Sequence, residues 1–178
     1  MRRLSIVLLV MLATASGAGV SAEVVEVSET AFFVRNHAEI SASPQQVYAA
    51  LTGEIAEWWD GAHSFSGDAG NLSLDARPGG CFCERLPDGG GVQHLTVVFA
   101  SPGKELRLSG GLGPLLEGAV VGTMIWRLTQ SAGATDVELS YRVSGSWPGG
   151  LATLAEPVDG VLRAQLLRLE RFVEGGRP

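Results

Sequence analysis

Apolar and polar residues alternate along residues 32–41. One face of this stretch would carry Val34, Asn36, Ala38 and Ile40, and the opposite face Arg35, His37 and Glu39. Because successive side chains of a strand point to opposite faces, the pattern predicts a half-buried first strand. His37 would lie on its exposed, charged face.

A helix is predicted immediately after this strand. Ser43 is a favoured N-cap, Pro44 suits the first helical position, and Gln46 can complete a capping box. The apolar positions of the helix are Val47, Ala50 and Leu51. Gly53 would end it. Residues 54–59 then predict a second short helical turn.

The middle of the chain predicts short strands separated by turns rich in glycine and proline. The expected strands cover residues 71–76, 81–86, 92–100, 105–109, 123–130 and 135–144. The glycine-rich, apolar residues 110–122 follow neither the two-residue period of a strand nor the 3.6-residue period of a helix. We expect them to form a loop that covers an apolar region.

The last predicted element is a long amphipathic helix over residues 157–173. Its apolar stripe consists of Val158, Val161, Leu162, Leu166, Leu169, Phe172 and Val173. One strand, two short helices, several antiparallel strands and a terminal helix predict an α+β fold. In this fold a curved antiparallel sheet wraps around the helix and can leave an internal cavity. Residues 32–174 would form a single domain, with 23–31 as a lead and 175–178 as a tail.

The N-terminus has the pattern of a secretory signal peptide. A basic pair, Arg2 and Arg3, precedes an apolar run and the small residues 20–22. The run is shorter than the roughly 20 residues that a bilayer span needs, so we expect no stable membrane anchor. Removing residues 1–22 takes away two basic residues and no acidic one, which moves the formal charge from −6 to −8. An acidic domain without a basic stripe argues against a nucleic-acid partner. The expected location is the periplasm or the extracellular space.

The order and spacing of several weak motifs resemble the START-like (SRPBCC) superfamily across roughly residues 32–173. The motifs are Ile40-x-Ala42-x-Pro44-x-x-Val47-Tyr48-x-x-Leu51, Trp58-Trp59, Leu74-x-x-Arg77-Pro78-Gly79-Gly80-x-Phe82 and Ser101-Pro102-Gly103-Lys104-x-Leu106. The closest branch is similar to bacterial homologues of the activator of the heat-shock-protein ATPase, near the polyketide-cyclase-like proteins.

The resemblance implies a helix-grip fold with a deep apolar cavity under the terminal helix. Members of the superfamily bind lipids, hormones or polyketides, and a minority catalyse cyclisation or dehydration. A secreted protein would not meet a cytosolic chaperone, so the signal peptide argues against co-chaperone work. We therefore predict a binding protein for a small hydrophobic molecule, with no cofactor. The sequence does not indicate an oligomeric state.

The candidate ligand-binding residues are Trp58, Trp59, Phe82, Trp126, Tyr141 and Gln165. Trp126 and Tyr141 face inward by alternation and each has a polar group. Phe82 occupies a position that is aromatic in the family. Trp58 and Trp59 point about 100° apart on a helix, so one can pack in the core while the other borders the cavity, or both can pack. Gln165 interrupts the apolar stripe, and its amide can face a ligand or bond to the backbone.

The Cys81-x-Cys83 pair departs from the family pattern and allows three interpretations. If the hairpin loop is residues 87–90, Cys83 faces His94 on the outer face of the sheet, and the inner face carries Phe82, Leu95, Val97 and Phe99. The two thiols can form a disulfide, bind zinc or copper together with His94, or remain reduced. The first two interpretations predict a redox or metal-binding module.

An enzyme of the cyclase or dehydratase type is the other alternative. It needs a titratable group in the cavity, for which Glu84, His94 and Tyr141 are candidates. His63, in the loop Asp60-Gly61-Ala62-His63-Ser64, could act as a general acid or base with Asp60 or Asp68, but no nucleophile is placed beside it, so an exposed or structural role is favoured. No complete catalytic motif is present.

Overall fold

A computed structural model describes residues 20–178. Its strands are β1 (Ser21–Ser28), β2 (Ala31–Ile40), β3 (Leu72–Leu74), β4 (Cys81–Arg85), β5 (Gly91–Ser101), β6 (Glu105–Ser109), β7 (Ala119–Gln130) and β8 (Thr135–Ser146). Its α-helices are α1 (Pro44–Gly53), α2 (Ile55–Trp58) and α3 (Ala155–Val173). Four 3₁₀ helices, η1 (Gly61–His63), η2 (Ala69–Asn71), η3 (Gly113–Glu117) and η4 (Leu151–Leu154), complete the described elements.

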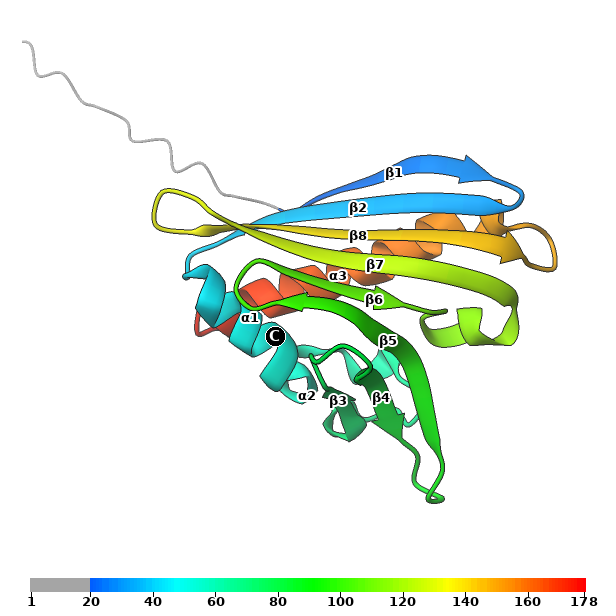
Figure 1. Cartoon of the computed structure of the whole chain (residues 1–178), viewed down its shortest axis with the longest axis horizontal. Coiled ribbons are helices and arrows are strands. Elements are labelled where there is room, and N and C mark those ends of the chain that lie inside the picture. The colour runs from blue at the N-terminus through cyan, green and yellow to red at the C-terminus, as the bar shows by residue number, and fades with distance from the viewer. Residues whose placement is uncertain (1–19) are drawn as a thin grey trace, which may run out of the picture.

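The eight described strands form one antiparallel sheet in the order β1-β2-β8-β7-β6-β5-β4-β3. The sheet curves, and α3 runs along its concave side, with α1 and α2 at one end (Figure 1). The predicted α+β arrangement of a curved sheet around a long C-terminal helix is confirmed. Both apolar surfaces, the inner face of the sheet and the stripe of α3, are buried against each other.

The N-terminus of α1 forms as the sequence predicts. Ser43 has extended backbone angles, and its side chain accepts a hydrogen bond from the backbone N–H of Gln46. The Gln46 side chain in turn accepts one from the backbone N–H of Ser43 at 3.0 Å, which completes the capping box. The helix ends at Gly53. These local signals direct the chain from β2 across the end of the sheet.

The core lies between α3 and the long central strands. Val34 and Ile40 on β2 are fully buried, as the alternation predicts, and His37 is exposed. The inward residues of β7 and β8 are buried as well: Met124, Trp126, Leu128, Val137, Leu139, Tyr141 and Val143. At roughly 25 cal/mol per Å² of apolar area, this burial is the main favourable contribution to folding.

The predicted lead over residues 23–31 is wrong in part, because residues 21–28 form the edge strand β1. Val24 of β1 pairs with Val34 of β2, and the register shifts between Val24 and Glu26. The strand is mostly exposed and contains this bulge, so it lacks the clean alternation of a half-buried strand. Residues 1–19 of the predicted signal peptide lie outside the described residues, whereas Ser21 and Ala22 begin β1.

The predicted loop over residues 110–122 is also shorter than expected. The 3₁₀ helix η3 occupies its centre, but β7 already begins at Ala119. Val121 is exposed and Val120 is half-buried, which blurs the period of this part of the strand. The remaining loop, residues 110–118, crosses one end of the sheet.

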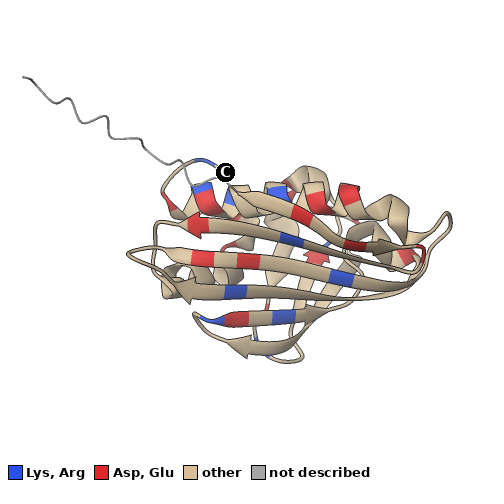
Figure 2. Cartoon of the chain, turned by 90° about the horizontal axis from the view of Figure 1, so that it is seen from above, with Lys and Arg blue, Asp and Glu red and all other residues tan. Residues whose placement is uncertain are grey.

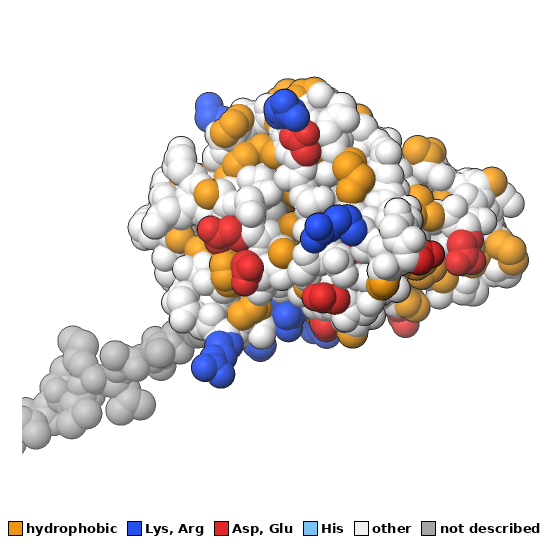
Figure 3. Space-filling model, turned by 90° about the horizontal axis from the view of Figure 1, so that it is seen from below, with side chains coloured by type: hydrophobic (Ala, Val, Ile, Leu, Met, Phe, Trp, Pro, Cys, Tyr) orange, Lys and Arg blue, Asp and Glu red, His pale blue; other side chains and the backbone are white. Residues whose placement is uncertain are grey.

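The outer face of the sheet carries many charged residues together with a few exposed apolar ones, among them Phe99. Acidic and basic residues are interspersed along its strands (Figure 2), and Arg127 of β7 pairs with Glu138 of β8 at 2.8 Å and with Glu105 of β6 at 3.2 Å. The face seen from below in Figure 3 carries scattered hydrophobic side chains between isolated charged ones. Among the helices of residues 20–178, none combines the length and apolar character that crossing a membrane requires.

The capping box gives a direct test of the local folding argument. We expect Ser43→Ala to lower the free energy of unfolding by about 1 kcal/mol, because a backbone N–H at the N-terminus of α1 loses its acceptor. Urea denaturation measures the change. Gln45→Ala is the matched control, since Gln45 is exposed in the same turn and takes no part in the capping box. Equal stability of Ser43→Ala and the control would contradict the argument.

Candidate ligand-binding cavity

A β-bulge between β4 and β5 determines which way His94 points. Phe82 pairs with Leu95, as predicted, but Cys83 pairs with Gln93 rather than with His94. The loop is therefore one residue shorter than expected, since the backbone N–H of Leu86 bonds to the carbonyl of Gly90, and His94 is the extra residue of a bulge opposite Phe82 and Cys83. As a result His94 and Leu95 are both buried, and the predicted position of His94 on the outer face is wrong.

A second bulge changes the other end of β5. The register shifts between Val97 and Phe99, so Val98 is the extra residue. Phe99 then lies on the outer face, 42% exposed, with the guanidinium of Arg107 4.8 Å from its ring centre. The prediction that Phe99 faces inward is therefore wrong, whereas Val97 is buried as predicted.

Glu84 and His94 form a buried pair. The Nε2 atom of His94 lies 3.0 Å from Oε2 of Glu84, and the two side chains are 3% and 0% exposed, respectively. The Glu84 carboxylate also accepts backbone N–H bonds from Phe65 at 3.0 Å and from Ser66. Both oxygens of the carboxylate are thus engaged, and the loop before η2 is tied to β4.

The hydrogen bonds determine how the pair ionises. Burial raises the pKa of Glu84, but hydrogen bonds from Ser66, Phe65 and His94 outweigh it and leave this pKa below its usual value. Burial lowers the pKa of His94, and the opposing effect of Glu84 does not restore it. Near neutral pH the pair therefore consists of an ionised Glu84 and a neutral His94.

A cavity of about 380 Å³ opens beside this pair. One wall comes from the N-terminal half of α3, and the others come from the loop around η1, from β4 and β5, from η3 and from the segment after β8. The lining side chains are mainly apolar: Trp59, Ala62, Phe65, Phe82, Leu112, Pro114, Leu115, Trp147, Leu154, Pro157, Val158, Val161 and Leu162. His63, Ser64, Gly113 and His94 complete the lining.

Four rings form a continuous aromatic part of this wall. The ring centres of Trp59 and Phe82 are 5.2 Å apart, and those of Phe82 and His94 are 5.0 Å apart. Phe65 also stacks on His94, with 5.8 Å between the ring centres. Two of the predicted ligand-binding residues, Trp59 and Phe82, thus lie on the cavity wall.

Trp58 and Trp126 lie in the packed core instead. Trp58 is fully buried and donates its indole N–H to the carbonyl oxygen of Ala50 at 3.0 Å. Its ring meets Trp126 edge to face, 6.4 Å between centres. The curvature of the sheet brings these two rings against each other, so they fill the space that the alternation alone would leave to a ligand.

The Tyr141 hydroxyl and the Gln165 amide oxygen bond to the backbone, whereas Nε2 of Gln165 has no hydrogen-bond partner in the described structure. The Tyr141 hydroxyl donates to the carbonyl of Gly110 at 2.8 Å and accepts the N–H of Leu112 at 3.0 Å. Burial raises its pKa to about 12. Gln165 accepts the N–H of Asp60 at 2.9 Å through its amide oxygen. Of the two alternatives for Gln165, the structure shows the backbone bond, and neither residue lines the cavity.

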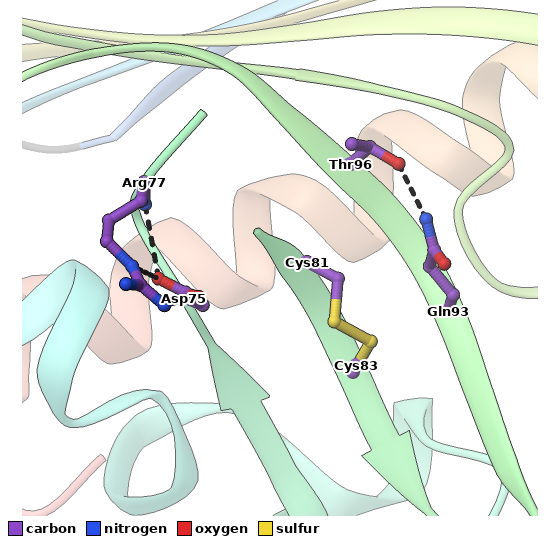
Figure 4. Close-up of a disulfide and its surroundings, with 6 residues drawn as sticks. All are labelled: Asp75, Arg77, Cys81, Cys83, Gln93 and Thr96. Carbon is purple, nitrogen blue, oxygen red and sulfur yellow. Dashed lines mark hydrogen bonds and ion pairs between the residues drawn. A yellow bond between two sulfur atoms is a disulfide. The ribbon is translucent and has the colours of Figure 1, made fainter. Parts of the chain in front are cut away.

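Cys81 and Cys83 form a disulfide on the outer face of β4 (Figure 4), with 5.4 Å between their Cα atoms. Gln93 and Thr96 of β5 lie beside it and bond to each other at 2.6 Å. His94 points to the opposite face, so the structure does not bring the two sulfurs and the imidazole together. Residues 20–178 contain no cluster of three or more His, Cys, Asp or Glu side chains able to hold a metal ion.

Of the candidates for acid–base chemistry, His94 lies on the cavity wall. Glu84 is hydrogen-bonded to His94 but does not line the cavity, and Tyr141 lies in the core. His63 is exposed on the wall, and Asp60 and Asp68 each cap a 3₁₀ turn. Phe65 and Trp147 also line the cavity, although no sequence pattern predicted them. The expectation that the loop after β6 covers an apolar region did point to Leu112 and Leu115.

No family model matches the sequence, and no curated protein matches it. Solved structures do match. CalU16 from Micromonospora echinospora is 15% identical with a TM-score of 0.59, over 89% of this chain and 87% of that one. The Aha1 dimer from Colwellia psychrerythraea is 20% identical with a TM-score of 0.59, over 82% of this chain and 98% of that one. DynU16, from the dynemicin biosynthetic locus, is 23% identical with a TM-score of 0.58, over 82% of this chain and 48% of that one.

These neighbours decide the architecture. It is a helix-grip fold, a curved antiparallel sheet around a long C-terminal helix. Identities this low establish the fold and leave the ligand and any activity open.

The Glu84–His94 pair predicts how stability depends on pH. Both groups have a lower pKa in the folded protein than their ordinary values of 4.5 and 6.5. As the pH falls, the unfolded state takes up these protons first, so the stabilisation present at neutral pH is lost. We expect the free energy of unfolding to decrease as the pH falls through 6.5, because of His94, and again through 4.5, because of Glu84.

Denaturation midpoints between pH 8 and pH 4 measure this dependence. His94→Gln keeps an N–H donor for Glu84 but removes the titration, so its curve should be flatter below pH 6.5. The control His63→Gln changes an exposed side chain and should retain the slope of the unsubstituted protein. Parallel curves for His94→Gln and the unsubstituted protein would contradict the assignment.

Proposed function

We propose that this protein binds a small hydrophobic molecule in the cavity between α3, η3 and the loop around η1. The observation that carries the proposal is the cavity itself. Its volume of about 380 Å³ falls within the range of ligand pockets, and its wall is largely apolar and aromatic. Burial of an apolar ligand there would contribute roughly 25 cal/mol per Å² removed from water.

Two polar anchors support a preformed cavity. Tyr141 ties the loop before η3 to the centre of β8 through Gly110 and Leu112. Glu84 ties the backbone of Phe65 and Ser66 to β4. Because each anchor is buried and hydrogen-bonded, both loops are held in place without a ligand. A preformed wall lowers the ordering cost of binding.

A fluorescent apolar probe tests this proposal. We expect N-phenyl-1-naphthylamine to bind with increased, saturable fluorescence. Val161→Trp should weaken that binding by at least about tenfold, because the added ring occupies volume that the probe needs. Arg163→Trp is the matched control: it adds the same ring on the exposed side of α3 and should bind the probe normally. Absence of saturable binding, or equal binding by both variants, would refute the proposed function.

We further propose that the mature protein acts outside the cytoplasm. The basic pair, the apolar run and the small residues before Glu23 support export. The Cys81–Cys83 disulfide agrees with it, since such bonds persist in oxidising compartments. Cleavage after Ala22 would leave β1 with residues 23–28 of its present span.

Intact-mass analysis of protein from the periplasm or the culture medium tests both features together. We expect a chain that starts at Glu23 and carries no free thiol, so alkylation without reductant leaves its mass unchanged. The Cys81→Ser, Cys83→Ser double variant controls for other reactive groups and should show the same N-terminus. An uncleaved chain in the cytoplasm, or two thiols open to alkylation, would contradict the proposal.

A further inference from the structure

His94 presents a buried polar atom without a partner. Its side chain is 3% exposed and contributes to the cavity wall. Nε2 is bonded to Glu84, whereas Nδ1 has no hydrogen-bond partner in the described structure. A buried polar atom left unpaired carries a desolvation cost of roughly 1–3 kcal/mol. The residue with this unpaired atom lies on the wall of a cavity large enough for a ligand.

The hydrogen bonds of Glu84 decide whether Nδ1 donates or accepts. An ionised carboxylate can only accept, so the Nε2 atom of His94 must carry the hydrogen of their shared bond. In a neutral imidazole the other nitrogen then has a free lone pair. Nδ1 of His94 is therefore an acceptor, and its missing partner is a donor.

The other polar side chains of the wall do not compete for this role. The indole N–H of Trp59 is used by the carbonyl of His63 at 3.1 Å, and the Ser64 hydroxyl donates to the carbonyl of Gly61 at 2.8 Å. His63 is exposed and Trp147 is half-buried, so water can satisfy both. Within the described cavity wall, His94 is thus the buried side chain that a ligand could complete.

We propose that the ligand is an aromatic or similarly flat hydrophobic molecule that carries a hydroxyl group, and that this hydroxyl donates a hydrogen bond to Nδ1 of His94. The inference rests on the proposed function and specifies its ligand class. Phe65 and Phe82 both pack against the imidazole, which favours a flat molecule that continues this aromatic wall. Glu84 acts as a positioning residue, because it fixes the tautomer and the orientation of His94 without lining the cavity.

The affinities of three biphenyl compounds distinguish the effect of the proposed hydrogen bond from the effects of ligand size and hydrophobicity. Displacement of N-phenyl-1-naphthylamine gives their affinities. We expect 4-phenylphenol to bind about fivefold tighter than both biphenyl, which is smaller, and 4-methoxybiphenyl, which is larger and cannot donate. About fivefold corresponds to the ~1 kcal/mol of one neutral hydrogen bond.

Two substitutions locate the acceptor. His94→Leu and His94→Phe should each abolish the preference for 4-phenylphenol while they retain binding of biphenyl. Val161→Ala is the matched control: it trims the apolar wall, so it should weaken all three compounds alike and keep the preference. If the His94 variants do not fold, the comparison of the three compounds on the unsubstituted protein still decides.

The outcomes separate the two proposals. Binding of all three compounds without preference for 4-phenylphenol would overturn the hydroxyl inference and leave the apolar cavity intact. A preference that survives in the His94 variants would overturn the assignment to His94. Failure of all three compounds and of the probe to bind would remove the proposed function itself.

Discussion

Glu84 places an ionised carboxylate in the interior of the protein, and the arrangement of the cavity depends on how that charge is satisfied. A buried carboxylate is tolerated when it is fully hydrogen-bonded, and Glu84 receives its donors from Phe65, Ser66 and His94. These donors lie on two separate segments, the loop before η2 and strand β5. The same charge therefore fixes a loop, orients an imidazole and leaves one imidazole nitrogen free at the cavity wall.

The inward orientation of His94 also depends on the β-bulge between β4 and β5. In a regular ladder without this bulge, His94 would pair with Cys83 and point outward, away from Glu84. With it, the imidazole lies inside, and the outer face carries the Cys81–Cys83 disulfide, which brackets Phe82. The two faces of β4 thus have different chemistry, a disulfide on one side and a buried ion–imidazole contact on the other.

Most of the architecture could be predicted from the sequence because it follows from local signals. The alternation of β2, the capping box at Ser43 and the stripe of α3 each depend on neighbouring residues only. The position of His94 could not be predicted, because one extra residue in a hairpin reverses which side chains face inward. The edge strand β1 was missed for a related reason: it is exposed on both faces and bulged, so its pattern is weak.

The candidate site was predicted only in part because inward direction does not determine packing. Trp59 and Phe82 lie on the cavity wall, but Trp58, Trp126 and Tyr141 face inward and are covered by other core groups. Which inward residues remain uncovered depends on the curvature of the sheet and the path of α3. Trp147 illustrates the opposite case, since it lies in a loop without periodicity and lines the cavity through long-range packing.

The central claim is that His94, on the cavity wall, keeps an unpaired acceptor nitrogen while its other nitrogen donates to Glu84. Nitrogen-15 NMR of the imidazole side chains in the ligand-free protein at neutral pH tests it most directly. The account predicts a neutral His94 with hydrogen on Nε2 and an unprotonated Nδ1, and loss of this tautomer preference in Glu84→Gln. A His94 protonated on Nδ1, or on both nitrogens, would contradict it.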